Sequence, residues 1–170
     1  MMKILINIFL FFILASSSYA NDNVFIAKDF SIVVPEEMTI DEKSNDEISL
    51  VFKGDEDLEN GILSVISKPC SNITSFDTAW PKIRSANISG KQILFEKEDA
   101  FSGLKWKVLA VSGESANCII QDVLYFSFDK NIQYMLHYHC SPENCEIMKV
   151  AFGKIIDSFK MQQDKEKSNN

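Results

Sequence analysis

The sequence predicts an α+β domain in which an antiparallel sheet of about six or seven strands is covered by helices. Two observations support this prediction. Short apolar and β-branched segments recur between turn-forming residues, and only two segments have the apolar spacing of a helix. Strands that follow one another in runs, with the helices apart, are typical of an antiparallel sheet with helices packed on it.

The first half of the predicted domain contains three strands. The first, 30–35, is ended by its proline, and the second, 48–52, alternates apolar and polar residues. The segment 36–46 between them is polar, so we expect a loop. The third strand covers 61–67 and follows an acidic turn at 54–60, which predicts a hairpin. We expect these strands to be neighbours in one antiparallel sheet.

The first helix is predicted over 75–86. Thr74 or Ser75 can cap its N-terminus, and Gly90 ends it. Pro81 either kinks this helix or restarts it at its own first turn.

Four further strands form a predicted meander. A tight turn at 129–131 joins the last two strands, and a turn at 113–117 joins the pair before them. The four strands are 92–98, 104–111, 119–128 and 132–140.

The second helix is predicted to start at Ser141, with a capping serine, a proline in the first turn and an early acid. Residues 161–170 are polar and charged, so we expect a disordered tail after a single domain at 21–160. One apolar stripe of the helix packs on the sheet; it contains Met148, Ala151, Phe152, Ile155, Ile156 and Phe159.

Met1–Ala20 has the pattern of a secretory signal peptide. Lys3 precedes an apolar run at 4–15, and the segment ends with Ser18 and Ala20 at the positions that a signal peptidase inspects. The run is shorter than the roughly 20 residues of a membrane-spanning helix. We therefore expect a mature chain that begins at Asn21, is periplasmic or secreted, and is not stably inserted in a membrane.

The charge balance limits the possible partners. The chain has 17 Lys and Arg against 24 Asp and Glu, a net charge of −7. Nucleic acids and anionic membrane surfaces attract basic proteins, so neither is an expected partner. We interpret the acidic excess chiefly as a determinant of solubility, with a cationic protein partner as the alternative.

Four cysteines lie after the predicted cleavage site, and an oxidising compartment favours two disulfides. We predict Cys140–Cys145, which closes a short loop at the start of the last helix, together with Cys70–Cys118. The main alternative is Cys118–Cys140, because these residues lie near facing ends of a predicted hairpin.

The order of elements resembles the PsbP/DcrB-like superfamily. The resemblance rests on the early strand 30–35, the long central meander and the closing segment 152–159. The tryptophan that often follows the early proline is missing here, and Met38 and Ile40 stand in that stretch. The resemblance implies a sheet of about seven strands covered by helices, and a role in binding partners rather than in catalysis. It transfers no catalytic residue to this chain.

Candidates for chemistry are few. His137 and His139 alternate on one strand, so their side chains share a face and could reach one zinc ion. Cys140 points to the other face, and an oxidised cysteine is no ligand. The chain contains no Gly-x-Ser-x-Gly nucleophile motif. We therefore predict no catalytic residue, no metal and no cofactor, and we interpret both histidines as ordinary strand residues.

The sequence thus predicts an exported, non-enzymatic protein that binds another protein in an immunity, chaperone or accessory role. Two alternatives stay open. A periplasmic hydrolase or metal-dependent enzyme would use a pocket near His137 and His139. A small-molecule or lipid carrier would need an enclosed apolar cavity.

Overall fold

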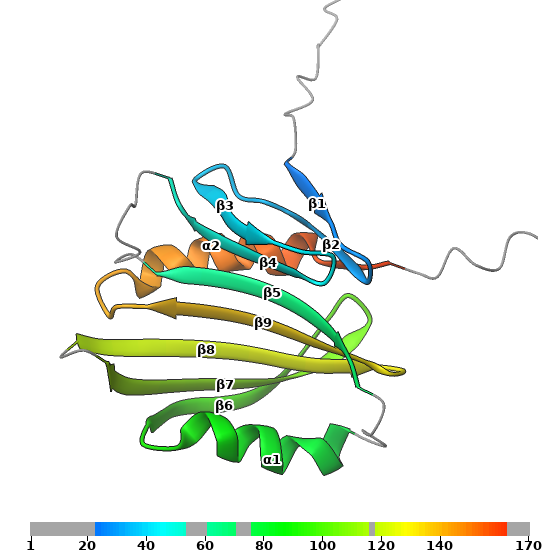
Figure 1. Ribbon diagram of the computed structural model, residues 1–170. Helices are drawn as coiled ribbons and strands as arrows, with labels where there is room; N and C mark the ends of the chain where they lie inside the picture. The colour runs from blue at the N-terminus through cyan, green and yellow to red at the C-terminus, as the bar shows by residue number, and fades with distance from the viewer. Residues whose placement is uncertain (1–22, 54–60, 71–75, 116–117, 163–170) are drawn as a thin grey trace, which may run out of the picture.

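The computed structural model describes residues 23–53, 61–70, 76–115 and 118–162. Its main feature is a seven-stranded sheet in the order β3-β4-β5-β9-β8-β7-β6, in which every neighbouring pair is antiparallel (Figure 1). The predicted α+β fold with helices on an antiparallel sheet is therefore confirmed. The strands are β3 (Met38–Lys43), β4 (Glu47–Phe52), β5 (Ile62–Pro69), β6 (Gln92–Phe101), β7 (Leu104–Ser115), β8 (Cys118–Asp129) and β9 (Ile132–Cys140).

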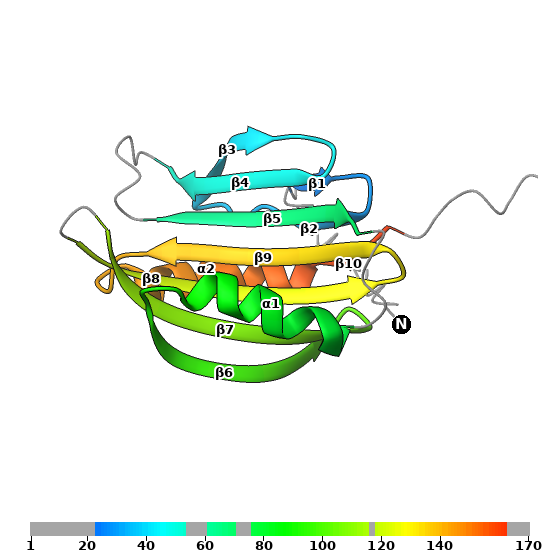
Figure 2. The same cartoon turned by 60° about the horizontal axis from the view of Figure 1, so that its bottom comes forward.

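The two helices lie on opposite faces of this sheet. α1 (Phe76–Ile88) packs through Trp80 on Leu109 and Leu124, whereas α2 (Cys145–Ser158) packs on the alternate side chains of the same strands. Figure 2 shows α1 in front of the sheet and α2 behind it. Because successive side chains of a strand point to opposite faces, the sheet contributes to two separate cores.

The larger core lies on the α2 face, between the sheet, α2 and a second, smaller sheet. Phe159 is 1% exposed at its centre, directly after α2. Its ring lies 5.9 Å from that of Phe30, 5.6 Å from that of Trp106 and 5.8 Å from that of Tyr134, measured between centroids. These aromatic contacts join segments from both ends and the middle of the chain.

The smaller sheet has the order β1-β2-β10, with β1 (Val24–Ile26), β2 (Phe30–Val33) and β10 (Lys160–Met161). The expectation that 30–35 joins the main sheet is therefore wrong. Met161 pairs with Phe30, so the ordered chain also extends into the predicted tail; residues 163–170 lie outside the described residues.

Most predicted elements are confirmed, with shifted ends. The expected strands at 48–52, 61–67, 92–98, 104–111, 119–128 and 132–140 all form, and α1 continues through Pro81. Three details differ. The predicted loop 36–46 contains β3, Gly113 lies within β7 rather than in a turn, and β1 was not predicted.

The start of α2 is a further correction. Residues 141–144 form a turn closed by a hydrogen bond from the Asn144 amide to the Ser141 carbonyl, and the helix begins at Cys145. Ser141 therefore does not cap the helix. The predicted turn at 54–60, the caps Thr74 and Ser75, and the segment Met1–Ala20 lie outside the described residues.

One of the two predicted disulfides is confirmed. Cys140 is bonded to Cys145, whereas Cys70 is a free cysteine. The Cys70 amide donates a hydrogen bond to the Asn131 carbonyl, so Cys70 lies near the C-terminal end of β8. Cys118 is the first residue of β8, and the length of this strand puts the two cysteines about 35 Å apart. A disulfide needs Cα atoms within about 7 Å, so Cys70–Cys118 is wrong. The alternative Cys118–Cys140 is also wrong, because Cys140 is already paired.

Among the described residues, neither helix is long and apolar enough to cross a membrane.

Candidate functional site

Among the described residues, α1 covers only part of its face of the large sheet. The apolar cluster under α1 is built from β7 and β8 and contains Trp80, Leu109, Val111, Leu124 and Phe126. In Figure 2, β3, β4 and β5 have no helix in front of them on this side. Beside α1, the side chains of His137 and His139 on β9 are partly exposed, whereas Ser64 on β5 and Asp122 on β8 are buried.

Polar side chains gather on this part of the face. The Ser49 and Ser64 hydroxyl oxygens lie 3.0 Å apart across β4 and β5. Ser64 stands opposite His137 on β9, and His139 stands opposite Asp122 on β8. The strand registers therefore place the two predicted histidines beside a carboxylate that the sequence analysis did not single out.

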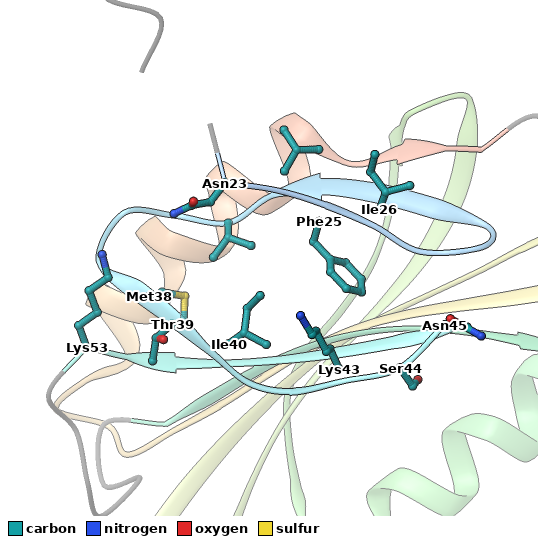
Figure 3. A pocket seen from close by; sticks show the side chains of 12 residues that line it. Asn23, Phe25, Ile26, Met38, Thr39, Ile40, Lys43, Ser44, Asn45 and Lys53 are labelled. Atoms are coloured by element: carbon teal, nitrogen blue, oxygen red, sulfur yellow. The ribbon is translucent and has the colours of Figure 1, made fainter. Parts of the chain in front are cut away.

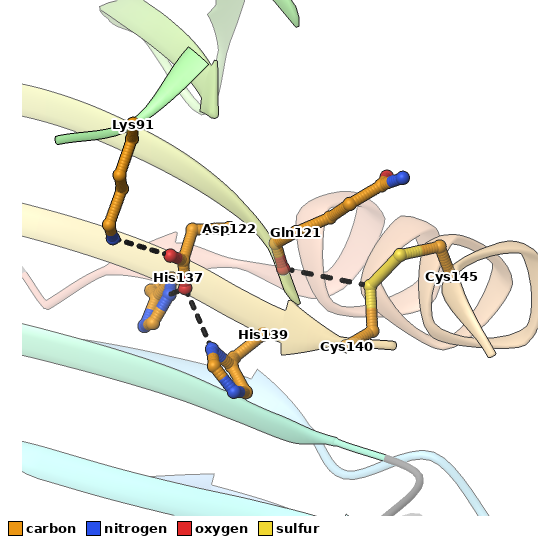
Figure 4. Close-up of polar contacts among 7 residues, drawn as sticks. All are labelled: Lys91, Gln121, Asp122, His137, His139, Cys140 and Cys145. Carbon is orange, nitrogen blue, oxygen red and sulfur yellow. Dashed lines mark hydrogen bonds and ion pairs between the residues drawn. A yellow bond between two sulfur atoms is a disulfide. The ribbon is translucent and has the colours of Figure 1, made fainter. Parts of the chain in front are cut away.

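Asp122 is the centre of this cluster. Its Oδ1 atom lies 2.9 Å from His137 Nε2 and 2.8 Å from His139 Nδ1, and its Oδ2 accepts a hydrogen bond of 2.7 Å from Lys91 Nζ (Figure 4). The residue is only 7% exposed. One carboxylate therefore contacts three potentially cationic side chains, which we call the Asp122 cluster.

The surroundings of Asp122 favour its ionised form. Burial by itself raises the pKa of this carboxyl group, but the hydrogen bonds with His137, His139 and Lys91 outweigh it and hold the pKa well below its ordinary value. A carboxylate that stays ionised is available as a strong acceptor or as a metal ligand at neutral pH.

Two glycines shape the cluster. A Cβ atom on Gly113 would lie 3.1 Å from Lys91 Cγ, so the absence of a side chain leaves room for the lysine to reach Asp122. Gly61 has a φ of +112°, and a Cβ there would lie 2.1 Å from the His139 carbonyl oxygen. Only glycine allows β5 to begin this close to His139.

A pocket of about 430 Å³ opens beside the cluster, lined by Asp122, His139, Lys91 and the segment after α1. The side chains of His137 and His139 are 25% and 36% exposed. The two imidazoles are therefore reachable from solvent, although the carboxylate between them is buried.

The side chains of the Asp122 cluster have the composition of a metal site. One ligand atom from each of Asp122, His137 and His139 can be chosen so that all lie within 4.8 Å of one another. The prediction that the histidines share a face is confirmed by their common partner. Cys140 is bonded to Cys145 in the core on the α2 side, as Figure 4 shows, so it takes no part.

A second feature is a cleft of about 710 Å³ between β1 and β3, the edge strands of the two sheets. Figure 3 shows Phe25 and Ile40 pointing into it from opposite walls, with Lys43 beside them and Lys53 at one end. Val24 and Ile26 on β1 are 52% and 68% exposed. The cleft therefore combines apolar walls with cationic side chains.

A third hollow, of about 490 Å³, lies between β6 and α2. Its floor includes Tyr125, Tyr138 and Phe152, and Leu94 and Phe95 on β6 are partly exposed at its side. Burial raises the pKa of Tyr138 to about 12, so its hydroxyl stays neutral.

No family model and no curated protein matches the sequence. Solved structures do match the fold. LpqN from Mycobacterium tuberculosis, described as involved in cell envelope biogenesis, superposes with a TM-score of 0.63 at 12% identity, over 79% of this chain and 83% of that protein. The cyanobacterial PsbP of Synechocystis sp. PCC 6803 superposes with a TM-score of 0.57 at 9% identity. The match covers 82% of this chain and 91% of that protein.

A protein of Bacteroides thetaiotaomicron matches with a TM-score of 0.53 at 9% identity; the match covers 81% of this chain but only 46% of that protein. Identities this low establish the architecture alone. The chain has a PsbP/DcrB-like fold, and the resemblance inferred from the order of its elements is confirmed at that level.

Proposed function

We propose that this protein is an exported, non-enzymatic accessory protein that binds an extended, acidic segment of a partner protein in the cleft between β1 and β3. The observation that carries the proposal is the cleft itself, a volume of about 710 Å³ bordered by the edge strands of two different sheets.

Edge strands favour an extended ligand. β1 pairs only with β2 and β3 only with β4, so within the described chain each has one edge without a strand neighbour. An extended segment can add to such an edge through main-chain hydrogen bonds, while pockets for alternate side chains provide specificity. Phe25 and Ile40 provide apolar contacts for those side chains.

Charge favours an acidic segment. Among the described residues that line the cleft, the charged side chains are Lys43 and Lys53, although the whole chain has a net charge of −7. These two lysines favour partner segments that carry carboxylates, although Asp41 and Glu42 are exposed on the same strand β3 outside the lining. The local charge therefore argues against the cationic partner considered from composition.

Export is supported by two separate observations. Met1–Ala20 has the signal-peptide pattern, and a neighbour in fold, LpqN, is described as involved in cell envelope biogenesis. A binding role in the envelope requires no catalytic group, which agrees with the absence of a nucleophile motif from the sequence.

A photo-crosslinking residue placed at Ile26 or Ile40 in the native host tests the proposal. The matched control is Val150, which is 62% exposed on α2. We expect adducts with one partner from the cleft positions and none from Val150, and a synthetic peptide from the crosslinked segment should bind the purified protein. Lys43→Glu should weaken peptide binding by about tenfold, with the loss shrinking at high salt. Equal adducts at Val150, or a peptide whose binding is unaffected by Ile40→Glu, would contradict the proposal.

A further inference from the structure

We infer that Asp122, His137 and His139 form a binding site for one divalent transition-metal ion, with an open coordination position toward the adjacent pocket. The site lies on the α1 face of the sheet and is independent of the cleft between β1 and β3. Its donors are two imidazole nitrogens and one carboxylate oxygen, a set that suits Zn²⁺ and other ions that prefer nitrogen and oxygen ligands.

The ligand atoms need little movement. Both histidine nitrogens lie within 2.9 Å of Asp122 Oδ1. Bonds of about 2.0–2.1 Å from a tetrahedral zinc ion place its ligands about 3.4 Å apart. Each histidine nitrogen would therefore move about half an ångström away from Asp122 Oδ1, a displacement that side-chain rotation can provide. The ion replaces the two hydrogen bonds with three coordinate bonds, and each imidazole binds it as the neutral tautomer that carries its hydrogen on the other ring nitrogen.

The backbone holds the ligands in place. Asp122 and His139 are directly paired between β8 and β9, and His137 is paired with Ser64 on β5. All three ligands therefore come from neighbouring central strands of the sheet, which is a rigid support. A site built on such strands costs less conformational entropy on binding than a site built on loops.

Lys91 acts as a positioning residue. It contacts Oδ2 of Asp122, not the Oδ1 atom that both histidines share, so it leaves a single carboxylate oxygen for the ion. Partners of this kind orient metal ligands in many sites. Its positive charge also opposes that of the ion, so Lys91 sets an upper limit on affinity.

Three protein ligands leave a position for water or for a small ligand. The pocket of about 430 Å³ reaches both Asp122 and His139, and the partly exposed histidines lie at the surface of the cluster. A closed structural site would surround its ion with four protein ligands. The Asp122 cluster instead fits a site from which the ion can exchange, or at which it can hold an additional anionic ligand.

The test is a titration of the purified, chelator-treated protein with Zn²⁺ by calorimetry, and with Co²⁺ by its visible absorption spectrum. We expect one equivalent to bind and the Co²⁺ bands to report nitrogen and oxygen ligands. His139→Asn should weaken Zn²⁺ binding by at least about 100-fold, because one of three ligands is lost. Lys91→Gln removes a nearby positive charge but keeps an amide donor for Asp122 Oδ2, so it should tighten binding by at least about threefold.

Two controls separate this site from adventitious binding. Cys70→Ser alters a free cysteine at the far end of the sheet and should leave the affinity unchanged. Circular dichroism shows whether Asp122→Asn still folds. If it does not, His139→Asn is the decisive variant, because the His139 side chain is partly exposed. The inference is overturned if no saturable equivalent of Zn²⁺ binds, or if His139→Asn binds it as tightly as the parent protein.

Discussion

The two faces of the large sheet differ in how completely they are covered. The α2 face is closed by a helix and a second sheet, and its core includes fully buried residues from both ends of the chain. In the part of the chain that the structure describes, the α1 face is closed by the helix over β7 and β8, and beside that apolar patch lie Asp122, His137, His139 and Ser64. The α2 face therefore contributes most to stability, whereas the α1 face holds a polar cluster in which the two histidines are partly exposed.

Truncation of one large aromatic residue on each face gives the largest expected difference. Phe159→Ala should lower the free energy of unfolding by about 3–5 kcal/mol, because it removes a fully buried ring from the centre of the larger core. Trp80→Ala should cost about 2 kcal/mol, since the cluster under α1 is smaller and can partly relax. Urea denaturation followed by circular dichroism measures both values.

Phe159→Leu is the matched control for volume, and it should cost no more than about 1.5 kcal/mol. Equal losses for Phe159→Ala and Trp80→Ala would mean that the two faces contribute equally to stability, and would contradict the larger contribution of the α2 face.

The disulfide gives an intermediate effect on the covered face. Cys140→Ser together with Cys145→Ser opens a link with a sequence separation of 5 between the end of β9 and the start of α2. The loss of this short crosslink should cost about 2 kcal/mol on the loop-entropy scale. Thermal unfolding measures it, and hydrogen exchange should increase at the first turn of α2 but not in α1. Increased exchange in α1 would show that the two faces are more tightly coupled than their separate cores suggest.

Glu96 gives the smallest expected effect, at the edge of the α1 face. Its carboxylate accepts hydrogen bonds of 2.8 Å from Arg84 Nε and 3.0 Å from Trp80 Nε1, which tie α1 to β6. The bond from Arg84, helped by that from Trp80, holds the pKa of Glu96 below its ordinary value despite burial. Glu96→Gln should cost at most about 1 kcal/mol at pH 7, because the group is partly exposed.

The pH dependence of this loss has a definite sign. Because the pKa of Glu96 is lower in the folded state, its contribution is complete above the usual glutamate value of 4.5 and is lost as the pH falls through its folded-state value. The stabilities of the parent protein and of Glu96→Gln should therefore begin to converge as the pH falls below 4.5 and should meet once the pH is below the lowered folded-state pKa. A difference that stays constant down to pH 3 would contradict an electrostatic origin.

The central strands could be predicted from the sequence because their apolar residues alternate or run together. β3 could not, because all its residues after Met38 are exposed and its sequence ends in Asp41, Glu42 and Lys43. An edge strand has only one neighbour and needs few buried side chains, so it resembles a loop in the sequence. The same reason applies to the three-residue β1.

The histidines could be predicted as a pair, but Asp122 was missed. The predicted tight turn at 129–131 could have identified Asp122, because a turn fixes which residues of its two strands stand opposite each other. If Asp129 pairs with Ile132 across that turn, antiparallel register places Asp122 opposite His139, as the structure shows. Counting residues back from the turn would have identified the carboxylate. The position of Lys91 could not be obtained in this way, because it depends on how α1 packs against the sheet.

The pairing of β2 with both β1 and β10 has a consequence for when the chain can fold. The Val33 amide donates a hydrogen bond to the Ser158 hydroxyl, 125 positions later, and Phe30 contacts Phe159 in the same region. A growing chain cannot close the larger core until this last segment has been synthesised, and contacts between distant residues form slowly. If the chain is exported as proposed, such late closure would keep it unfolded, and so able to pass through a translocation channel, until its C-terminal strand has crossed the membrane.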